Sequence, residues 1–191
     1  MHHSPISQIT FTAIDFESAG SASGKTDAPI QIGTTSWNSE QGITDTWMSY
    51  IHTDRDITWA AQKVHGISKD DLVEAPKMYL LWPEVKKRLA NCAVVAHGHG
   101  TEKRFLRAFP GHGFGPWIDT LHLSRKIWPD LESHSLGSVC EHCNIVEKIK
   151  DVVPDKSWHD ALFDAAASMI LLEFIIQDHE LTTRDLSTLA Q

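Results

Sequence analysis

Apolar and polar residues alternate along the first third of the chain in the manner of β-strands. Residues 8–16 place alternate apolar side chains on one face, although Ile14 and Phe16 break the pattern near its end. Residues 30–36 and 43–51 show two more extended patterns, and the polar and glycine residues between them are typical of a hairpin loop. The pattern therefore predicts an antiparallel meander of three strands.

The rest of the chain has mainly helical periodicity, interrupted by one short apolar run. Residues 92–96 are all apolar, as expected of a strand buried on both faces. Helices are predicted at residues 58–65, 79–90, 101–109, 120–128, 135–143 and 158–177. Ser157, followed by Asp160 three residues later, resembles a capping box, which predicts that the last helix begins directly after Ser157.

This order of elements predicts a single α/β domain. Its centre would be a mixed β-sheet, in which the three-strand meander is joined by further strands, and helices would flank the sheet. We place the domain at residues 8–177, between an N-terminal tail at 1–7 and a polar C-terminal tail with weak helical tendency at 178–191.

Composition and charge restrict the function only in part. The formal net charge of −8 argues against a protein that coats nucleic acid by bulk electrostatics. Bound divalent metals and a local basic patch can still reverse the field at one site. There is no long uncharged apolar run and no secretory signal, so we expect no membrane association. The three cysteines, an odd and small number, suit a reducing compartment, and we expect a cytoplasmic location.

Two carboxylates lie one residue apart at the end of the first predicted strand. Asp15 and Glu17 repel each other, which makes their close approach costly. A divalent cation removes that cost, and hard oxygen ligands suit Mg²⁺ or Mn²⁺. The alternative is a strand end that simply exposes two acidic residues to water.

A second polar pair opens the last predicted helix. Asp164 lies among small and apolar residues, which would let another element or a ligand approach closely. His159 is expected in the first turn, where it can act as a general base toward water. The alternative is an ordinary helix start with polar residues.

The third acidic candidate, Glu102, follows the buried strand at 92–96. It opens a helix beside Lys103, Arg104 and Arg107. The alternative is an ordinary first-turn acid, with the three cations forming a solvated face.

Taken together, these segments resemble the DEDDh branch of the DnaQ-like exonucleases, which have the ribonuclease-H-like fold. The first motif is matched by FTAIDFESAG, the second by VVAHGHGTEKRFL and the third by HDALFDA. A further segment, ITWAAQKVHGIS, resembles the loop that follows the third strand in this family. The matches occur in family order and span residues 8–177, so they are more specific together than apart.

The resemblance implies a metal-dependent 3′→5′ exonuclease that releases nucleoside 5′-monophosphates by a two-metal mechanism. Asp15, Glu17 and Asp164 would hold the Mg²⁺ or Mn²⁺ ions. Glu102 would contribute through water, and His159 would deprotonate the attacking water.

The resemblance also implies the substrate and its contacts. The partner would be the 3′ end of single-stranded DNA or RNA, while the oligomeric state stays open. The backbone around Ser18 and Ala19, together with His65, would hold the terminal nucleotide.

The second motif departs from the family pattern. Gly98 stands where Asn is usual, Thr101 where an aromatic residue is usual, and Glu102 where Asp is usual. Glu keeps the charge and adds one methylene group. The departure concerns rate and substrate grip more than the class of reaction.

Two other functions compete with this interpretation. One is a non-catalytic nucleic-acid-binding module on the same fold, motivated by the altered second motif. The other is an unrelated metallohydrolase with histidine ligands, built on His97 and His99 with His112 as a loose third candidate. A zinc site at Cys140 and Cys143 would need two more ligands, which the sequence does not supply nearby.

The chain has seven tryptophans, and most of them should belong to the core. Aromatic faces can also stack on single-stranded bases without sequence preference. Trp37, Trp59 and Trp158 are the candidates for such a role.

Overall fold

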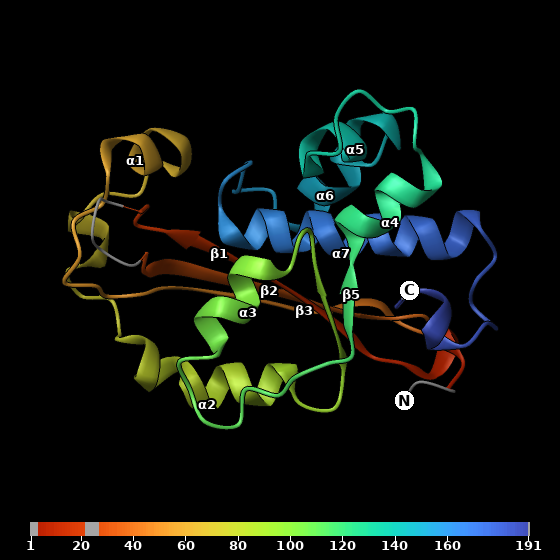
Figure 1. Cartoon of the computed structure of the whole chain (residues 1–191), viewed down its shortest axis with the longest axis horizontal. Helices are drawn as coiled ribbons and strands as arrows, with labels where there is room; N and C mark the ends of the chain where they lie inside the picture. The colour runs from red at the N-terminus through yellow and green to blue at the C-terminus, as the bar shows by residue number, and fades with distance from the viewer. Residues whose placement is uncertain (1–3, 22–26, 191) are drawn as a thin grey trace.

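The centre of the molecule is a mixed five-stranded β-sheet (Figure 1). A computed structural model describes residues 4–21 and 27–190. The strands are β1 (Phe11–Ser18), β2 (Pro29–Asn38), β3 (Gly42–Tyr50), β4 (Ala93–Ala96) and β5 (Trp117–Asp119). They lie in the order β3-β2-β1-β4-β5, with β1, β2 and β3 antiparallel and with β4 and β5 parallel to β1. The predicted meander and the mixed sheet are confirmed.

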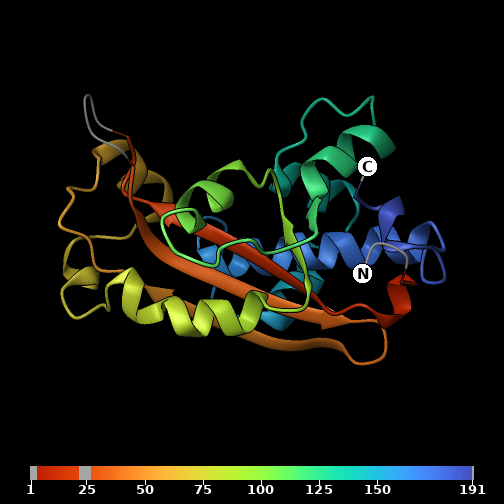
Figure 2. The same cartoon turned by 60° about the horizontal axis from the view of Figure 1, so that its bottom comes forward.

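Helices cover both faces of the sheet. They are α1 (Trp59–His65), α2 (Met78–Leu89), α3 (Gly100–Leu106), α4 (Thr120–Ile127), α5 (Leu136–His142), α6 (Val146–Val152) and α7 (Ala161–Asp178). The long α7 lies on one face, while α2 and α3 lie on the other, as the turned view in Figure 2 shows. No helix in the described ranges is long and apolar enough to cross a membrane.

Strand β1 is buried on both sides, which explains its broken alternation. Phe11 and Ala13 pack into the core under α7, and Ile14 and Phe16 pack into a second core under α2 and α3. The two apolar residues that break the pattern therefore belong to the opposite face of the sheet. A strand between two helical layers needs apolar residues on both faces.

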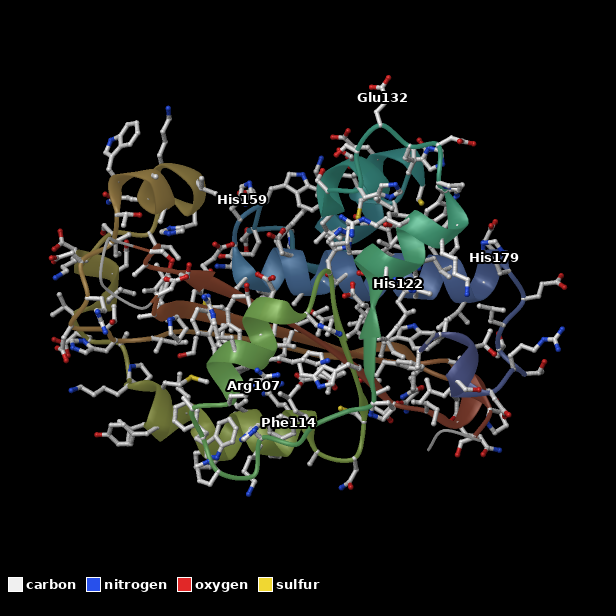
Figure 3. All side chains as sticks on the ribbon, viewed as in Figure 1. Arg107, Phe114, His122, Glu132, His159 and His179 are labelled. Atoms are coloured by element: carbon white, nitrogen blue, oxygen red, sulfur yellow. The ribbon has the colours of Figure 1, made fainter. Side chains whose placement is uncertain are left out.

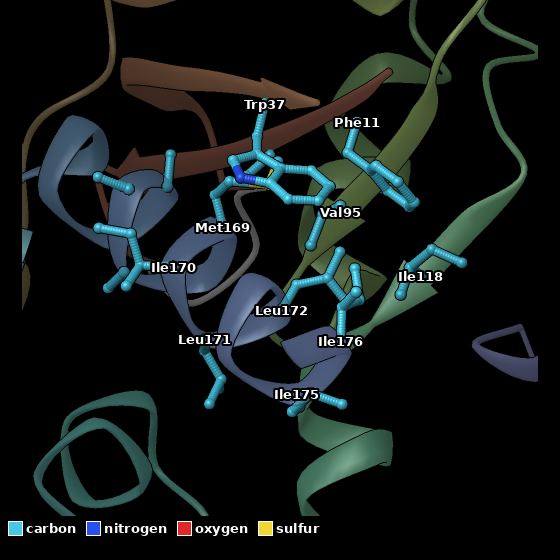
Figure 4. Close-up of a cluster of buried hydrophobic side chains, with 14 of the residues drawn as sticks. Phe11, Trp37, Val95, Ile118, Met169, Ile170, Leu171, Leu172, Ile175 and Ile176 are labelled. Atoms are coloured by element: carbon cyan, nitrogen blue, oxygen red, sulfur yellow. The ribbon is translucent and has the colours of Figure 1, made fainter. Parts of the chain in front are cut away.

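Helix α7 is the main element of the larger core. Most of its side chains are buried, because the sheet lies on one side of it and α5 and α6 lie on the other. Figure 4 shows Met169 and Leu172 of α7 near Phe11, Trp37 and Val95 of the sheet. This packing fixes the axis of α7 relative to β1 and β2.

Helix α7 begins later than the sequence suggested. Its first residue is Ala161, and its N-cap is Asp160, whose carboxylate accepts a hydrogen bond from the N–H of Leu162 at 2.9 Å. The predicted cap at Ser157 is wrong because His159 has φ of +66°, which a right-handed helix does not tolerate. His159 therefore lies just before the helix and not in its first turn.

The sequence also missed two short elements. Strand β5 has only three residues, and α6 has seven. Strand β5 is too short to show a clear period, and it exists because its backbone pairs with β4.

Both predicted tails pack against the domain where the structure describes them. Ile6 and Leu186 are fully buried, and Leu189 is nearly so. The two segments are joined by backbone hydrogen bonds, including that from the N–H of Ile6 to the carbonyl of Arg184 at 2.9 Å. A few apolar side chains in a mostly polar segment are enough to hold it on the surface of the core. Residues 1–3 and 191 lie outside the described residues.

Candidate active site

The floor of the candidate site is the end of β1. Successive side chains of a strand point to opposite faces, so Asp15 and Glu17 continue the face that carries Phe11 and Ala13. Both carboxylates therefore point toward the layer of α7. The sequence places them where the apolar face ends, and β1 is central enough that both are partly buried.

Helix α7 brings the second group of polar residues over this floor. Asp164 lies in its first turn, and His159 lies in the loop that leads into it, as Figure 3 shows for His159. Ligand atoms of Glu17, His159 and Asp164 all lie within 4.8 Å of one another. Residues that are far apart in the sequence thus converge at one point.

Two residues of β2 dock the start of α7 on the sheet. The buried Gln31 accepts a hydrogen bond from the N–H of Ala161 at 2.9 Å and donates one to Asp160 at 3.0 Å. Gly33, which pairs with Asp15 in the sheet, lets the α7 backbone approach. A Cβ atom at Gly33 would lie 2.2 Å from the carbonyl oxygen of Ala161.

Sequence reasoning missed Gln31 and Gly33 as positioning residues. The signal was present, because a glycine inside a strand often marks the close approach of another backbone. A polar Gln within the otherwise apolar IQI segment was a second signal.

Glu102 reaches the site from the other helical layer. It lies on the inner face of α3 and is only 5% exposed. Its Oε2 atom has no hydrogen-bonding partner within the described residues, and the same is true of Oδ1 of Asp164. Buried carboxylate oxygens without partners are costly, so a ligand is expected to satisfy them.

Burial and neighbouring negative charges raise the pKa values of the four carboxyl groups. Burial raises the pKa of Asp15 well above its usual range, and the charges of Asp164, Glu102 and Glu17 raise it further. Burial followed by the charge of Asp164 raises the pKa of Glu17 to about 8. Burial is also the first cause for Asp164 and for Glu102, whose pKa values rise to about 7. This pattern is that of a site that lacks positive charge.

The residues present fit divalent metal ions. The cluster supplies hard oxygen donors, one histidine nitrogen and two orphaned buried carboxylate oxygens. Two positive ions would offset the repulsion that raises the pKa values. In the part of the chain that the structure describes, Glu17, His159 and Asp164 are the one group with this ligand spacing.

His65 holds the backbone next to the acidic strand end. Its Nδ1 atom accepts a hydrogen bond from the N–H of Ile67 at 3.0 Å, so its Nε2 carries the proton and donates to the carbonyl of Ser18 at 3.2 Å. The N–H and C=O of Ala19 are bonded to Ala28 and Thr58. The contacts of Ser18, Ala19 and His65 with a nucleotide stay predictions, and these bonds show how the three residues are held.

The conformation of Gly98 explains one departure of the second motif. Its φ is +84°, a region that glycine and asparagine tolerate better than other residues. Its N–H donates to Asp119 Oδ1 at 3.0 Å, and the same oxygen caps α4. The exchange of Asn for Gly therefore preserves the backbone conformation of this turn.

The histidine-ligated alternative does not fit the geometry. Nδ1 and Nε2 of His97 are hydrogen-bonded to Thr120 and to the carbonyl of His134, so neither is free for a metal. His99 is hydrogen-bonded to Lys103, and His112 to the carbonyl of Phe109. Cys140 of α5 and Cys143 at its C-cap are buried free thiols, and residues 4–21 and 27–190 supply no further ligands beside them for zinc.

The three candidate tryptophans differ in exposure. Trp37 is only 3% exposed and belongs to the core, and Trp158 packs edge-on against Phe163. Trp59 is 75% exposed, and the ammonium group of Lys63 lies over its ring, 5.1 Å from the ring centroid.

The fold and the site together define a class of protein. Carboxylates on the central strand of a mixed sheet, completed by an acid from a long helix and a histidine just before that helix, are typical of metal-dependent nucleases. Residues 12–172 match the model of the RNase_T family, which is described as exonuclease. The chain therefore belongs to this exonuclease family, and it carries an exonuclease domain.

Curated relatives agree with this assignment. The chain is 30% identical to DNA polymerase III PolC-type of Thermotoga petrophila over 145 residues. The matched region covers 73% of this chain and 10% of the relative. The chain is 31% identical over 141 residues to the 3′-5′ exonuclease DinG of Staphylococcus epidermidis, covering 71% of the chain and 15% of that protein. The chain thus spans a small part of the length of these relatives.

Solved structures confirm the predicted ribonuclease-H-like fold. Exonuclease X in complex with 5′ overhanging duplex DNA matches with a TM-score of 0.74 and 22% identity, covering 95% of this chain and 99% of that one. The nuclease domain of 3′hExo, a DEDDh family member bound to rAMP, matches with a TM-score of 0.71 and 15% identity, covering 94% and 97%. The chain therefore shares the fold of these exonucleases.

Proposed function

We propose that this chain removes nucleotides from the 3′ end of single-stranded DNA or RNA and releases nucleoside 5′-monophosphates. The observation that carries the proposal is the convergence of Glu17, Asp164 and His159 within 4.8 Å beside Asp15. Family membership supports the reaction class, and the buried carboxylate oxygens support a metal-dependent chemistry.

The cofactors in this proposal are two Mg²⁺ or Mn²⁺ ions. Asp15, Glu17 and Asp164 would hold them, with Glu102 contributing from α3. When bound, the ions would polarise the phosphoryl oxygens and stabilise the negative charge that develops during hydrolysis. The residues themselves offer the negative charge that such ions require.

His159 is the general base in the proposed reaction. It is exposed and lies beside Glu17 and Asp164, so water and substrate can both reach it. It would accept a proton from water as the water oxygen bonds to phosphorus and the bond to the 3′ oxygen breaks. The shortened strand leaves with a 3′-hydroxyl group, and the other product is a nucleoside 5′-monophosphate.

A cytoplasmic location belongs to the same proposal. Cys92, Cys140 and Cys143 are buried free thiols, which supports a reducing environment.

A degradation assay with 5′-labelled single-stranded DNA and RNA tests the proposal. In Mn²⁺ or Mg²⁺ the label should stay on strands that shorten one nucleotide at a time, and chromatography should detect nucleoside 5′-monophosphates. EDTA should stop the reaction. Tight binding without any shortening would support the non-catalytic module instead, and immediate release of the labelled nucleotide would contradict the 3′→5′ direction.

A further inference from the structure

The outer face of α3 has an unusual charge for this acidic protein. The chain has 17 Lys and Arg residues against 25 Asp and Glu residues, yet α3 and its C-cap carry three cations, the half-buried Lys103 and the exposed Arg104 and Arg107. The one acid in this stretch, Glu102, is buried on the inner face. The charged side chains that this helix exposes are therefore all basic.

A fourth cation, on α2, lies next to the loop that follows α3. Lys86 is exposed, and its ammonium group lies beside Gly111 in the loop after α3. We call Lys86, Lys103, Arg104 and Arg107 the basic strip. Figure 3 shows Arg107 on the side of α3 that faces α2.

The basic strip is only partly neutralised by the protein. Arg104 donates to Asp27 at 3.3 Å, and Lys103 contacts the His99 ring at 3.0 Å and lies over the Trp117 ring at 5.1 Å. Arg107 is exposed, and its side chain forms no ion pair or hydrogen bond with the described residues. Two of the four cations, Lys86 and Arg107, thus project their charge into solvent.

Three cations of the strip belong to the helix that carries Glu102 or to its C-cap, and Arg104 lies close enough for its charge to lower the pKa of the buried Glu102 carboxyl. The strip therefore begins beside the carboxylate cluster, within reach of the strand whose 3′ end the site would hold.

We propose that the basic strip binds the phosphodiester backbone of the substrate strand, upstream of its 3′-terminal nucleotide. The inference rests on the proposed function and adds to it a surface that anchors the strand. Cations that meet phosphates give affinity without sequence preference, and this affinity falls as salt rises. The strip would thus offset the repulsion between a polyanion and a chain with a net charge of −8.

The test compares a long and a short substrate for the same variants. Arg107→Ala and the triple variant K86A/R104A/R107A would be assayed on a 20-nucleotide single strand and on the p-nitrophenyl ester of thymidine 5′-monophosphate. The ester has no upstream phosphates, so its hydrolysis should stay within about twofold of the wild-type rate. For the long strand, KM should rise about two- to fivefold for Arg107→Ala, the range expected of one exposed ion pair, and more for the triple variant. Arg184→Ala, an exposed arginine near the chain termini, is the matched control.

Salt dependence gives a second, independent readout. Fluorescence anisotropy of a labelled single strand in EDTA measures binding without hydrolysis. Each lost phosphate contact should reduce the slope of log K against log salt by about 0.7. An unchanged slope and KM in the triple variant would overturn the strip. A wild-type protein that binds the strand with the expected slope but hydrolyses neither substrate would leave the strip intact and refute the proposed function.

Discussion

Two helices bring an acid to Asp15, and they are held in very different ways. Helix α7 has 18 residues, a capped start and two dedicated β2 residues, Gln31 and Gly33, beneath its first turn. Helix α3 has seven residues, no side-chain cap and a left-handed glycine before it. The start of α7 is therefore held in place by specific contacts, whereas the start of α3 is only lightly held.

The difference shows where geometric accuracy matters in this site. Glu17, His159 and Asp164 lie close enough to share a ligand, and the protein fixes their positions through β1, β2 and α7. Glu102 stands alone on its helix, and a longer side chain than the family's usual Asp is found there. We infer that the residues fixed by β1, β2 and α7 hold the metals and provide the base, and that the position of α3 adjusts.

Replacement of Asp15, which lies between the acids of α7 and α3, should have the largest effect on turnover. Asp15→Asn should lower turnover by about 10³-fold or more, since metal stabilisation contributes several kcal/mol to such a barrier. Titration calorimetry should show the loss of Mn²⁺ binding. Equal Mn²⁺ binding by variant and wild type would show that Asp15 is not a ligand.

The same variant should be more stable than the wild type when no metal is bound, although it is less active. Because the folded-state pKa of Asp15 is raised, the folded protein favours its protonated form, and stability is lost as pH rises above the unfolded value of about 4. Without metal at pH 8, Asp15→Asn should therefore melt at a higher temperature than the wild type. A lower melting temperature would mean that favourable contacts of the Asp15 carboxylate outweigh the repulsion within the cluster.

His159→Ala tests whether His159 is the general base. Turnover should fall by about 10²–10⁴-fold, the usual contribution of a general base, while Mn²⁺ binding stays nearly intact. His179→Ala, an exposed histidine just after the other end of α7, is the matched control and should be silent. A folded His159→Ala protein with full activity would rule out the role.

Gly33→Ala tests whether activity requires α7 to stay in its position on the sheet. The added methyl group would meet the backbone of Ala161, so α7 must shift, at a cost of about 1–3 kcal/mol in stability. A shift of about 1 Å in a reacting group can cost about 10²-fold in turnover. Gly113→Ala has open space around it and controls for the substitution itself. Wild-type turnover and melting temperature in Gly33→Ala would show that the docking is not critical.

Glu102→Asp should have the smallest effect. We expect turnover within about tenfold of wild type, a change of about 1.4 kcal/mol in the barrier, because the lightly held helix can adjust to a shorter arm. Glu102→Ala should cost considerably more. If Glu102→Ala melts slightly lower but cleaves at the wild-type rate, Glu102 is only a first-turn acid that favours the helix dipole.

The sequence was most informative where apolar patterns were long and where polar residues interrupted them. The meander and the buried strand at β4 followed from such patterns, whereas the expectation that Asp15 and Asp164 share a site came from the family resemblance of their motifs. Each of these predictions depends on neighbouring residues or on the order of motifs, both of which can be read directly from the linear sequence.

What could not be predicted depends on contacts between distant segments. The start of α7 is set by Asp160, which Gln31 holds from across the sheet. The three residues of β5 form a strand only because β4 is beside them. The opposite-face role of Ile14 required knowledge that a second helical layer covers the sheet.

The paired chain ends have a practical meaning for anyone who handles this domain. Because Ile6 and Leu186 are buried in one seam, a recombinant fragment that stops at Gln177 would expose an apolar surface and leave Ile6 without its cover. The described N-terminal and C-terminal segments lie side by side, away from the start of α7 (Figure 1). A domain whose first and last segments are adjacent can be spliced into a surface loop of a host protein with short junctions.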